Sequence, residues 1–357
     1  MTTSTDRDDR LLPRPRDLVR VGPHDGAHLP ALRVAVAVVV PMVLLAAAGR
    51  LEWVPYAVFG GFAAAFGRGL PRFRRTGMQL EAGGVLVASV VLGTLLSASG
   101  ASLPVTVGVL GLVAGGASAV ADLRRWAPPG PLFPVFAAGV CAFVPATGTS
   151  VGVSALVAGA SLVLALATGL VGVALPHGRA ALRTAEGRSW RRHPRPPAGR
   201  LVALHAAICV VAAVTAGLLS TALGFEHPYW AMVSAVVPVV GRQTSTQLVR
   251  ASHRLVGTLL GVGVAAGLLA LDLPPVGLIA AFGVLQFAAE LSVMRHYGLT
   301  LLFITPMALG MGALTGPVDV AALVTDRAAD TAIGVGVVVL LLLATHRLRT
   351  GRGPTAA

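Results

Sequence analysis

The sequence predicts an all-α polytopic membrane protein with about twelve transmembrane helices, arranged as two parallel six-helix repeats. Three observations predict this fold: the composition, the spacing of the apolar runs and the distribution of the arginines. Of the 357 residues, 55% are apolar and only 12% are charged. A soluble domain carries about 25% charged residues. The long apolar runs are therefore expected to lie in a lipid bilayer.

Twelve apolar runs can be counted between charged residues, glycines and prolines. An α-helix needs about 20 apolar residues to cross the hydrocarbon core. The first six runs cover 32–49, 54–66, 80–98, 103–121, 132–147 and 151–175. The other six cover 201–223, 229–240, 255–271, 274–291, 297–314 and 328–345. In each half the second run is short, which matters for the site predicted below.

The runs divide the chain into two membrane repeats and three polar segments. Residues 32–175 are predicted to form the first repeat and residues 201–346 the second. Residues 1–31 mix acids, arginines, prolines and glycines, so we expect a disordered cytoplasmic tail. Residues 176–200 form an Arg/Pro-rich cytoplasmic linker, and residues 347–357 a second cytoplasmic tail.

The arginines predict the topology. All 28 basic residues are arginines, and the net charge is +13. When successive connections are assigned to alternate faces, 26 of the 28 arginines fall on one face, and only Arg50 and Arg327 fall on the other. Because positive residues resist translocation, both termini are predicted to be cytoplasmic, and the short runs 54–66 and 229–240 are predicted to cross. A nucleic-acid partner is not expected, because such arginines would cover a soluble surface. The linker arginines are expected to contact anionic lipid headgroups instead.

The two halves of the chain also resemble each other in sequence, which indicates an internal repeat. Shifting the chain by 174 positions places residues 52–96 over 226–270 without a gap. The coinciding residues include Glu52 with Glu226, Gly67 with Gly241, and Arg68 with Arg242. Because each half contains six spans, both repeats insert in the same orientation, and their pseudo-twofold axis runs along the membrane normal.

The most specific motif lies around the short run of the second half. It reads His-Pro-Tyr-Trp-Ala at 227–231, Gly-Arg-Gln-Thr-Ser-Thr-Gln at 241–247, and Arg-x-x-x-Arg-x-x-Gly-Thr-x-x-Gly at 250–261. This pattern resembles the fusaric acid resistance (FUSC) family, also described as aromatic acid exporter-like membrane proteins. The resemblance implies a multi-pass transporter of the bacterial inner (cell) membrane that exports small organic anions, aromatic or other carboxylic acids. The first half matches less well, since Leu80 replaces Arg254. Many family members carry sizeable cytosolic domains, whereas this chain has only the short linker.

The spacing within the motif suggests how an anion would be held. Arg250 and Arg254 are four residues apart and share a helical face. Gly257 and Gly261 continue that stripe, and small residues at this spacing let another helix approach closely. Short or proline-broken spans at matching positions of two repeats point to a transport site, and Pro238 is expected to break the short run of the second half. The candidate substrate-binding residues are Arg68, Arg242, Gln243, Arg250, Arg254, Tyr229 and Trp230.

An alternative interpretation assigns these residues no ligand. Arginines beside helix ends also fix topology and contact lipid headgroups, and Tyr229 and Trp230 can act as interfacial anchors. Arg68 and Arg242 are related by the repeat, so an anion site would require them to face one shared cavity. Guanidinium groups would then orient a carboxylate through paired hydrogen bonds.

Acidic residues inside spans are costly and suggest functional roles. Glu290 is the candidate for proton coupling, and it is also positioned in sequence to pair with Arg295. Asp326, Arg327 and Asp330 are expected to form a cluster at the outer boundary, in which the neighbouring acids neutralise Arg327.

Other kinds of chemistry have no visible signature. The histidines lack metal-ligand spacing, and no phosphate loop or catalytic set appears, so no metal, cofactor or enzyme activity is expected. The two cysteines lie within apolar runs and do not indicate a disulfide framework. A passive anion channel and a non-transporting scaffold that binds envelope partners or lipid remain the alternative functions, and an oligomer is compatible with the sequence.

Overall fold

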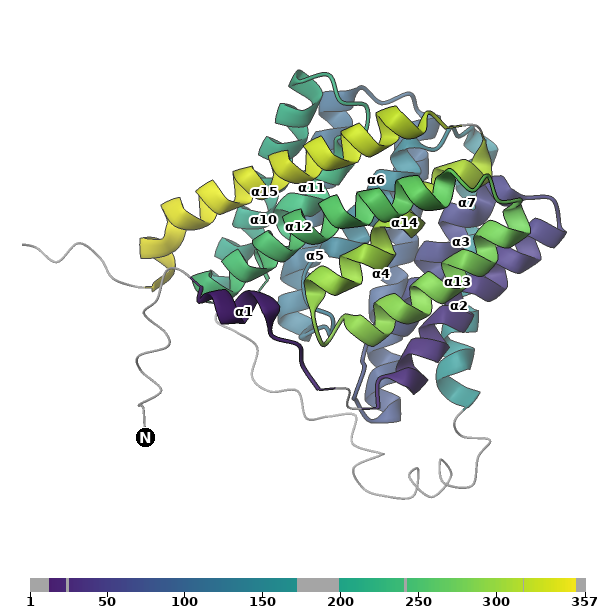
Figure 1. Cartoon of the computed structure of the whole chain (residues 1–357), viewed down its shortest axis with the longest axis horizontal. Coiled ribbons are helices and arrows are strands. Elements are labelled where there is room, and N and C mark those ends of the chain that lie inside the picture. The colour runs from purple at the N-terminus through teal and green to yellow at the C-terminus, as the bar shows by residue number, and fades with distance from the viewer. Residues whose placement is uncertain (1–12, 24–25, 172–198, 241–242, 317, 351–357) are drawn as a thin grey trace, which may run out of the picture.

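The protein is entirely helical in the part that can be described. A computed structural model describes residues 13–23, 26–171, 199–240, 243–316 and 318–350 (Figure 1). No β-strand occurs within these ranges. Among the described residues, twelve apolar helices follow one short N-terminal helix, and each of the twelve predicted runs overlaps one of them. The predicted fold class, a polytopic α-helical membrane protein, is confirmed.

The helices occur in the same order in both halves. The first half contains α2 (His28–Ala47), α3 (Val54–Gly61), α4 (Arg72–Ala98), α5 (Leu103–Arg124), α6 (Leu132–Phe143) and α7 (Gly148–Val171). The second contains α10 (Gly199–Ala222), α11 (Tyr229–Val236), α12 (Thr244–Leu269), α13 (Pro275–Ser292), α14 (Tyr297–Thr315) and α15 (Val320–Thr350). Two short 3₁₀ helices, η2 (Leu51–Trp53) and η3 (Phe62–Ala65), flank α3.

Three of the twelve helices are too short to span a bilayer alone. Among the described residues, nine helices are long and apolar enough to cross, whereas α3, α6 and α11 have 8, 12 and 8 residues. At 1.5 Å per residue these lengths are roughly 12–18 Å, against about 30 Å for the hydrocarbon core. Helix α3 continues into η3, and α11 gives way to buried non-helical chain at 237–240, which contains Pro238. The break predicted at this proline is confirmed.

Buried glutamines satisfy the backbone where the short helices end. The Gln79 side-chain amide donates to the carbonyls of Ala64 and Phe66, at 3.2 and 3.3 Å. In the second half, the Gln247 amide donates to the Val239 carbonyl at 2.7 Å. Both glutamines are fully buried. Non-helical backbone is tolerated at membrane depth when protein groups replace the missing helical bonds, and these two side chains do so in both halves.

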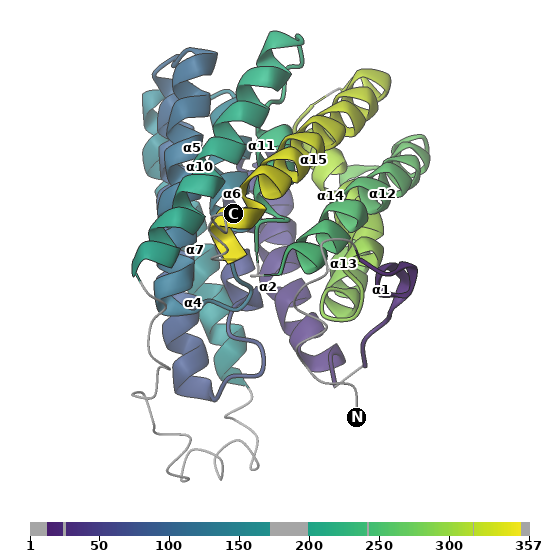
Figure 2. The ribbon, with the colours of Figure 1, turned by 90° about the vertical axis from the view of Figure 1, so that its left-hand side faces the viewer.

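Helix packing follows the same scheme in both halves, which supports the two repeats. Helix α3 packs on α2 and α7, as α11 packs on α10 and α15. Helix α4 packs on α6 and α7, as α12 packs on α14 and α15. The halves meet along two further pairs, α2 with α13 and α10 with α5, which we call the two seams (Figures 1 and 2). At each seam the first helix of one half lies against the fourth helix of the other.

Hydrogen bonds between connections show that the helix ends alternate between two faces. At one face, the Gly67 N–H after α3 donates to the carbonyl of Ala127 between α5 and α6, at 2.7 Å. At the other face, the Ser97 hydroxyl near the end of α4 donates to the Val144 carbonyl just after α6, at 2.7 Å. The connection that follows α3 and contains Arg68 therefore lies beside the connection that follows α5.

The predicted close approach at Gly257 and Gly261 is confirmed. A Cβ atom added to Gly257 would lie 2.5 Å from the Gly298 carbonyl oxygen, and one added to Gly261 would lie 2.6 Å from that of Leu301. Helix α14 therefore lies directly against the glycine face of α12. This contact holds Tyr297, the first residue of α14, beside the part of α12 that contains Arg250 and Arg254.

The N-terminal tail differs from the disordered segment that was expected. Helix α1 (Pro15–Val19) rests on α12, and the Leu18 carbonyl accepts hydrogen bonds from His253 Nε2 at 2.8 Å and His296 Nε2 at 2.9 Å. Paired histidine donors fix this segment although its composition is polar. Residues 1–12, most of the predicted linker and residues 351–357 lie outside the described ranges.

Candidate functional site

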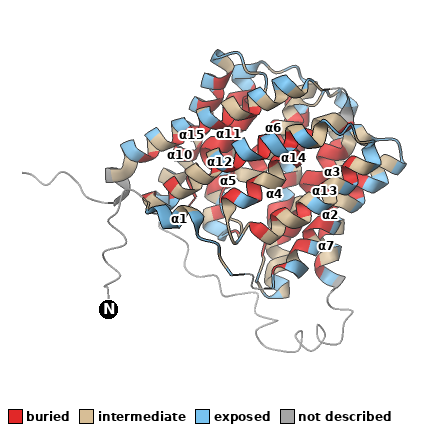
Figure 3. Ribbon diagram, viewed as in Figure 1, coloured by how far each residue is buried: buried red, intermediate tan, exposed pale blue. Residues whose placement is uncertain are grey.

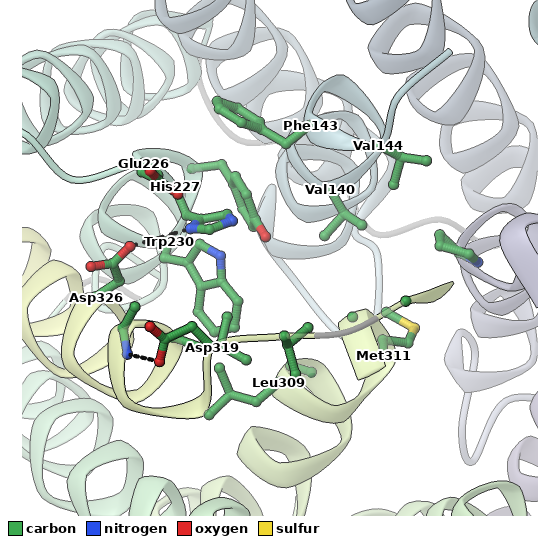
Figure 4. A pocket seen from close by; sticks show the side chains of 18 of the residues that line it. Val140, Phe143, Val144, Glu226, His227, Trp230, Leu309, Met311, Asp319 and Asp326 are labelled. Carbon is green, nitrogen blue, oxygen red and sulfur yellow. Dashed lines mark hydrogen bonds and ion pairs between the residues drawn. The ribbon is translucent and has the colours of Figure 1, made fainter. Parts of the chain in front are cut away.

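A cavity of about 520 Å³ lies among α6, α11, α14 and the first turns of α15. In Figure 4, His227, Trp230 and Asp326 lie across from Phe143, Val140 and Val144. Tyr229 also lines the cavity, together with four carboxylates: Glu52, Glu226, Asp319 and Asp326. Glu52 and Glu226 are the pair related by the repeat. The cavity therefore combines an aromatic wall with an acidic rim at the face opposite the arginine-rich connections.

Trp230 links this cavity to a buried arginine. The guanidinium carbon of Arg327 lies 3.7 Å from the centre of the Trp230 ring. Such cation–π contacts contribute about 0.5–2 kcal/mol. Arg327 is only 2% exposed, and its Nε and Nη1 atoms have no hydrogen-bond partner. Trp230 is only 3% exposed. It belongs to α11, and all residues of this helix are buried (Figure 3).

Arg327 and Asp330 lie deeper than the boundary cluster that was expected. Helix α15 begins at Val320 rather than at residue 328, because the Asp319 carboxylate accepts the backbone N–H groups of Ala321 and Ala322 and caps the helix. Neither Asp326 nor Asp330 forms an ion pair with Arg327 within 4 Å, although Asp330 still attracts its charge at longer range. Asp326 pairs with His227 instead, at 3.4 Å between Oδ2 and Nδ1.

Arg254 approaches the same place from α12. Its Nε donates to the Ser234 hydroxyl of α11 at 3.2 Å, and its Nη1 donates to the Tyr297 hydroxyl of α14 at 3.4 Å. Arg254 is 3% exposed, and its Nη2 has no hydrogen-bond partner. Arg254 reaches α11 through Ser234 and Arg327 lies on the ring of Trp230 of the same helix, so two like charges are buried near each other and repel. We call Arg254, Arg327, Trp230 and Tyr297 the buried arginine cluster.

The buried arginine cluster has the chemistry of an anion site. Two positive charges share one desolvated region, and several of their N–H donors are unused. Burying an uncompensated charge costs several kcal/mol. A carboxylate or a similar anion would both balance charge and accept the unused donors, and the guanidinium group suits this geometry.

The candidate of the first half lies at a different place, where α13 meets the first repeat. Arg68 forms an ion pair with Glu290, 2.7 Å between Nη2 and Oε2, and its Nη1 donates to the Glu290 backbone carbonyl at 3.0 Å. Gln286 donates to the other carboxylate oxygen at 3.3 Å. The partner of Glu290 is therefore Arg68 rather than Arg295, whose Nε donates to the Gly22 carbonyl. The guanidinium group of Arg68 is thus already paired with a carboxylate of the protein itself.

The remaining predicted residues are not gathered with these groups. Arg242 lies outside the described residues, so a cavity shared with Arg68 stays a prediction. Gln243 is exposed just before α12, where its Oε1 accepts from the Thr246 hydroxyl. Arg250 is half-buried one turn before Arg254. Of the predicted substrate-binding residues, Arg254, Tyr229 and Trp230 are the three brought together.

Sequence reasoning missed the contributions of Arg327, Ser234 and Tyr297. Arg327 carried a usable signal, because it is one of two arginines on the face that otherwise excludes them. Such an exception indicates that the side chain is held inside the protein rather than at a cytoplasmic surface. Ser234 and Tyr297 carried no comparable signal, since hydroxyl groups are common in membrane helices.

Comparison with known proteins places this cluster within a recognised family segment. Residues 213–341 match the family described as "Fusaric acid resistance protein-like", and this range contains the whole buried arginine cluster. The chain is also 31% identical, over 144 residues, to the "Uncharacterized membrane protein YvaC" of Bacillus subtilis (strain 168). That alignment covers 39% of this chain and 22% of the relative. No solved structure matches the chain. The resemblance predicted from the motif is confirmed: residues 213–341 of the chain match the fusaric acid resistance protein-like family of membrane proteins.

Proposed function

We propose that the protein transports small organic anions and that the buried arginine cluster holds the anion during passage. The carrying observation is the pair of guanidinium groups of Arg254 and Arg327, which are desolvated at membrane depth and retain unused N–H donors. Ionisable side chains inside a membrane protein are expensive and mark transport pathways. Aromatic or other carboxylic acids are the substrate class that the family resemblance implies.

The charge distribution supports export from the arginine-rich face to the acidic cavity. Arginines at the first face raise the local concentration of anions, and the carboxylates around the cavity lower it at the other face. Trp230 belongs to both places, because it lines the cavity and carries Arg327 on its ring. The path thus runs past the cluster and leaves through the cavity. In the predicted topology this direction is outward across the inner membrane.

Uptake of labelled benzoate into proteoliposomes tests this function. The native chain is expected to show saturable transport, and Arg254→Met and Arg327→Met are each expected to reduce its rate at least about tenfold, because each removes one charged hydrogen-bond donor group. Arg50→Met is the matched control, since Arg50 is exposed and its ion pair with Glu52 is loose at 3.6 Å. This variant is expected to transport at the native rate.

Stability measurements separate a lost site from a lost fold. Removing an unpaired buried charge is expected to leave the unfolding temperature of Arg327→Met equal to that of the native chain or higher. Large ohmic anion currents would indicate a channel instead of a carrier. If no carboxylate moves and both arginine variants behave as the native chain does, the transport proposal is wrong and a scaffold role follows.

A further inference from the structure

Asp330 is a buried acid that the transport proposal has not used. It lies one turn after Arg327 on α15 and is fully buried. Its Oδ1 accepts the Ser220 hydroxyl of α10 at 2.6 Å. Its Oδ2 is buried without a hydrogen-bond partner. An ionised carboxylate would be poorly compensated in this position, whereas a protonated one carries its own donor.

Helices α10, α11 and α12 pack against α15, and each contributes a polar or charged side chain near Asp330; α14 adds Tyr297, which bonds to Arg254. Its own helix supplies Asp326 and Arg327, whose charges both act on it. Helix α11 supplies Tyr229, on which the Asp330 charge acts. Helix α12 supplies Arg254 and α14 supplies Tyr297, and both act on Arg327. Helix α10 supplies Ser220. The acid therefore belongs to the same electrostatic unit as the buried arginine cluster.

The net charge of this unit depends on one proton. With Asp330 ionised, two arginines face one carboxylate; with Asp330 protonated, both positive charges are available to a ligand. An arriving anion and an ionised Asp330 would place two negative groups in one desolvated region. Two carboxylates sharing a site favour a state in which one of them is protonated.

We propose that Asp330 is a proton-binding site and that an anion binds the buried arginine cluster together with a proton on Asp330. This inference rests on the proposed anion site. Asp330 takes the proton from water, and no covalent bond forms with the anion. A monovalent anion and its proton then occupy the site as a neutral pair.

The cavity gives the proton a route to Asp330. Asp326 lines the cavity and lies four residues before Asp330, on the same face of α15. His227 also lines the cavity and bonds to Asp326. Carboxylate and imidazole groups relay protons between water and buried sites. The acidic rim that disfavours anions at this face concentrates protons there.

The test is benzoate binding to the purified full-length protein, measured calorimetrically from about pH 6 to about pH 8. Benzoate remains ionised across this range. If binding requires a protonated Asp330, affinity falls as pH rises, by up to about tenfold per pH unit where Asp330 titrates. Buffers with different ionisation enthalpies report the protons taken up, and uptake is expected to approach one proton per bound benzoate.

Two variants make the assignment specific. Asp330→Asn keeps an oxygen to accept the Ser220 hydroxyl but cannot titrate, so its affinity is expected to be independent of pH and its proton uptake to vanish. Asp272→Asn is the matched control. Asp272 is exposed between α12 and α13, away from the cavity lining, and its left-handed backbone conformation also suits asparagine. The linkage is expected to remain in this variant.

The outcomes distinguish the two proposals. Native protein that binds benzoate without proton uptake would retain the anion site and overturn the role of Asp330. Uptake that persists in Asp330→Asn would also overturn it. Failure of the native protein to bind benzoate at any pH would overturn the anion site, and the linkage would fall with it.

Discussion

Arg68 and Glu290 show how a single interaction joins parts of the chain separated by 222 positions. The side chains are 17% and 12% exposed, and Arg68 holds both the carboxylate and the backbone carbonyl of Glu290. Removing one member of a buried pair leaves the other charge uncompensated, which costs more than replacing both.

A double-mutant cycle tests this pair. Arg68→Met and Glu290→Met are each expected to lower the unfolding free energy in mixed detergent by about 3–5 kcal/mol, and the double variant by less than either single change. The comparison with Arg50→Met and Glu52→Met provides an exposed control, for which a coupling below about 1 kcal/mol is expected. Additive effects at Arg68 and Glu290 would show that the charges do not depend on each other.

At the scale of elements, close helix contacts determine where the buried groups meet. A Cβ atom on Gly334 of α15 would lie 2.2 Å from the Ala231 carbonyl oxygen of α11. One on Gly336, two residues further along α15, would meet nothing within 4 Å. The absence of a side chain at Gly334 therefore lets α15 approach α11 and brings Arg327 onto Trp230.

Gly334→Ala is expected to destabilise the protein by about 1–3 kcal/mol, because backbone atoms must move apart to admit the methyl group. Gly336→Ala is expected to be neutral or to stabilise by up to about 1 kcal/mol, because alanine favours a helix over glycine. Thermal unfolding of the two variants in detergent makes the comparison. Equal unfolding temperatures would contradict the close contact.

The glutamines at the ends of the short helices give a second prediction at this scale. Gln79→Met keeps the length of the side chain but leaves the carbonyls of Ala64 and Phe66 without their donor, so a loss of about 1–3 kcal/mol is expected. Ser89→Ala on the same helix is the control. Its hydroxyl donates to the Val85 carbonyl, which lies within the helix, and a smaller loss is expected. Chemical denaturation in detergent measures both, and similar losses would count against a role for Gln79.

The element scale also shows what the sequence could predict. Apolar runs and alternating arginines were enough to locate twelve helices, because burial in lipid constrains every residue of a span. The start of α15 was missed, since Asp326, Arg327 and Asp330 resemble a polar boundary although they lie inside the helix. The partner of Glu290 was misassigned to Arg295 because a nearby arginine is visible in sequence, whereas Arg68 is brought in by tertiary packing.

At the scale of the whole molecule, the two halves share one packing scheme and meet at the two seams. At the α5–α10 seam, His205 Nδ1 lies 2.6 Å from the Asp122 carboxylate. At the α2–α13 seam, Glu290 near the end of α13 forms its ion pair with Arg68. At each seam, therefore, the acid lies near the C-terminal end of the fourth helix of one half. Its basic partner comes from the other half.

Labelling of single cysteines with a membrane-impermeant maleimide tests whether the short helices cross. Ala48→Cys and Pro71→Cys flank α3 at exposed positions, and Leu223→Cys and Thr246→Cys flank α11. In intact cells, the first member of each pair is expected to react and the second to react only after the membrane is opened. Cys141 and Cys209 are buried, so a control chain without introduced cysteines is expected to remain unlabelled. Reaction of both flanking positions from one side would show that the intervening helix is re-entrant.

The seams also have a consequence for how the protein is made. Helix α2 is synthesised early, but the helix that covers it, α13, emerges only after most of the chain has been translated. Until then, the inward face of α2 must be shielded by lipid or by the insertion machinery. Neither half can complete its packing alone, because the first helix of each half packs against the fourth helix of the other. Separately expressed halves are therefore expected to assemble only with each other, as complementary fragments of one interlocked fold.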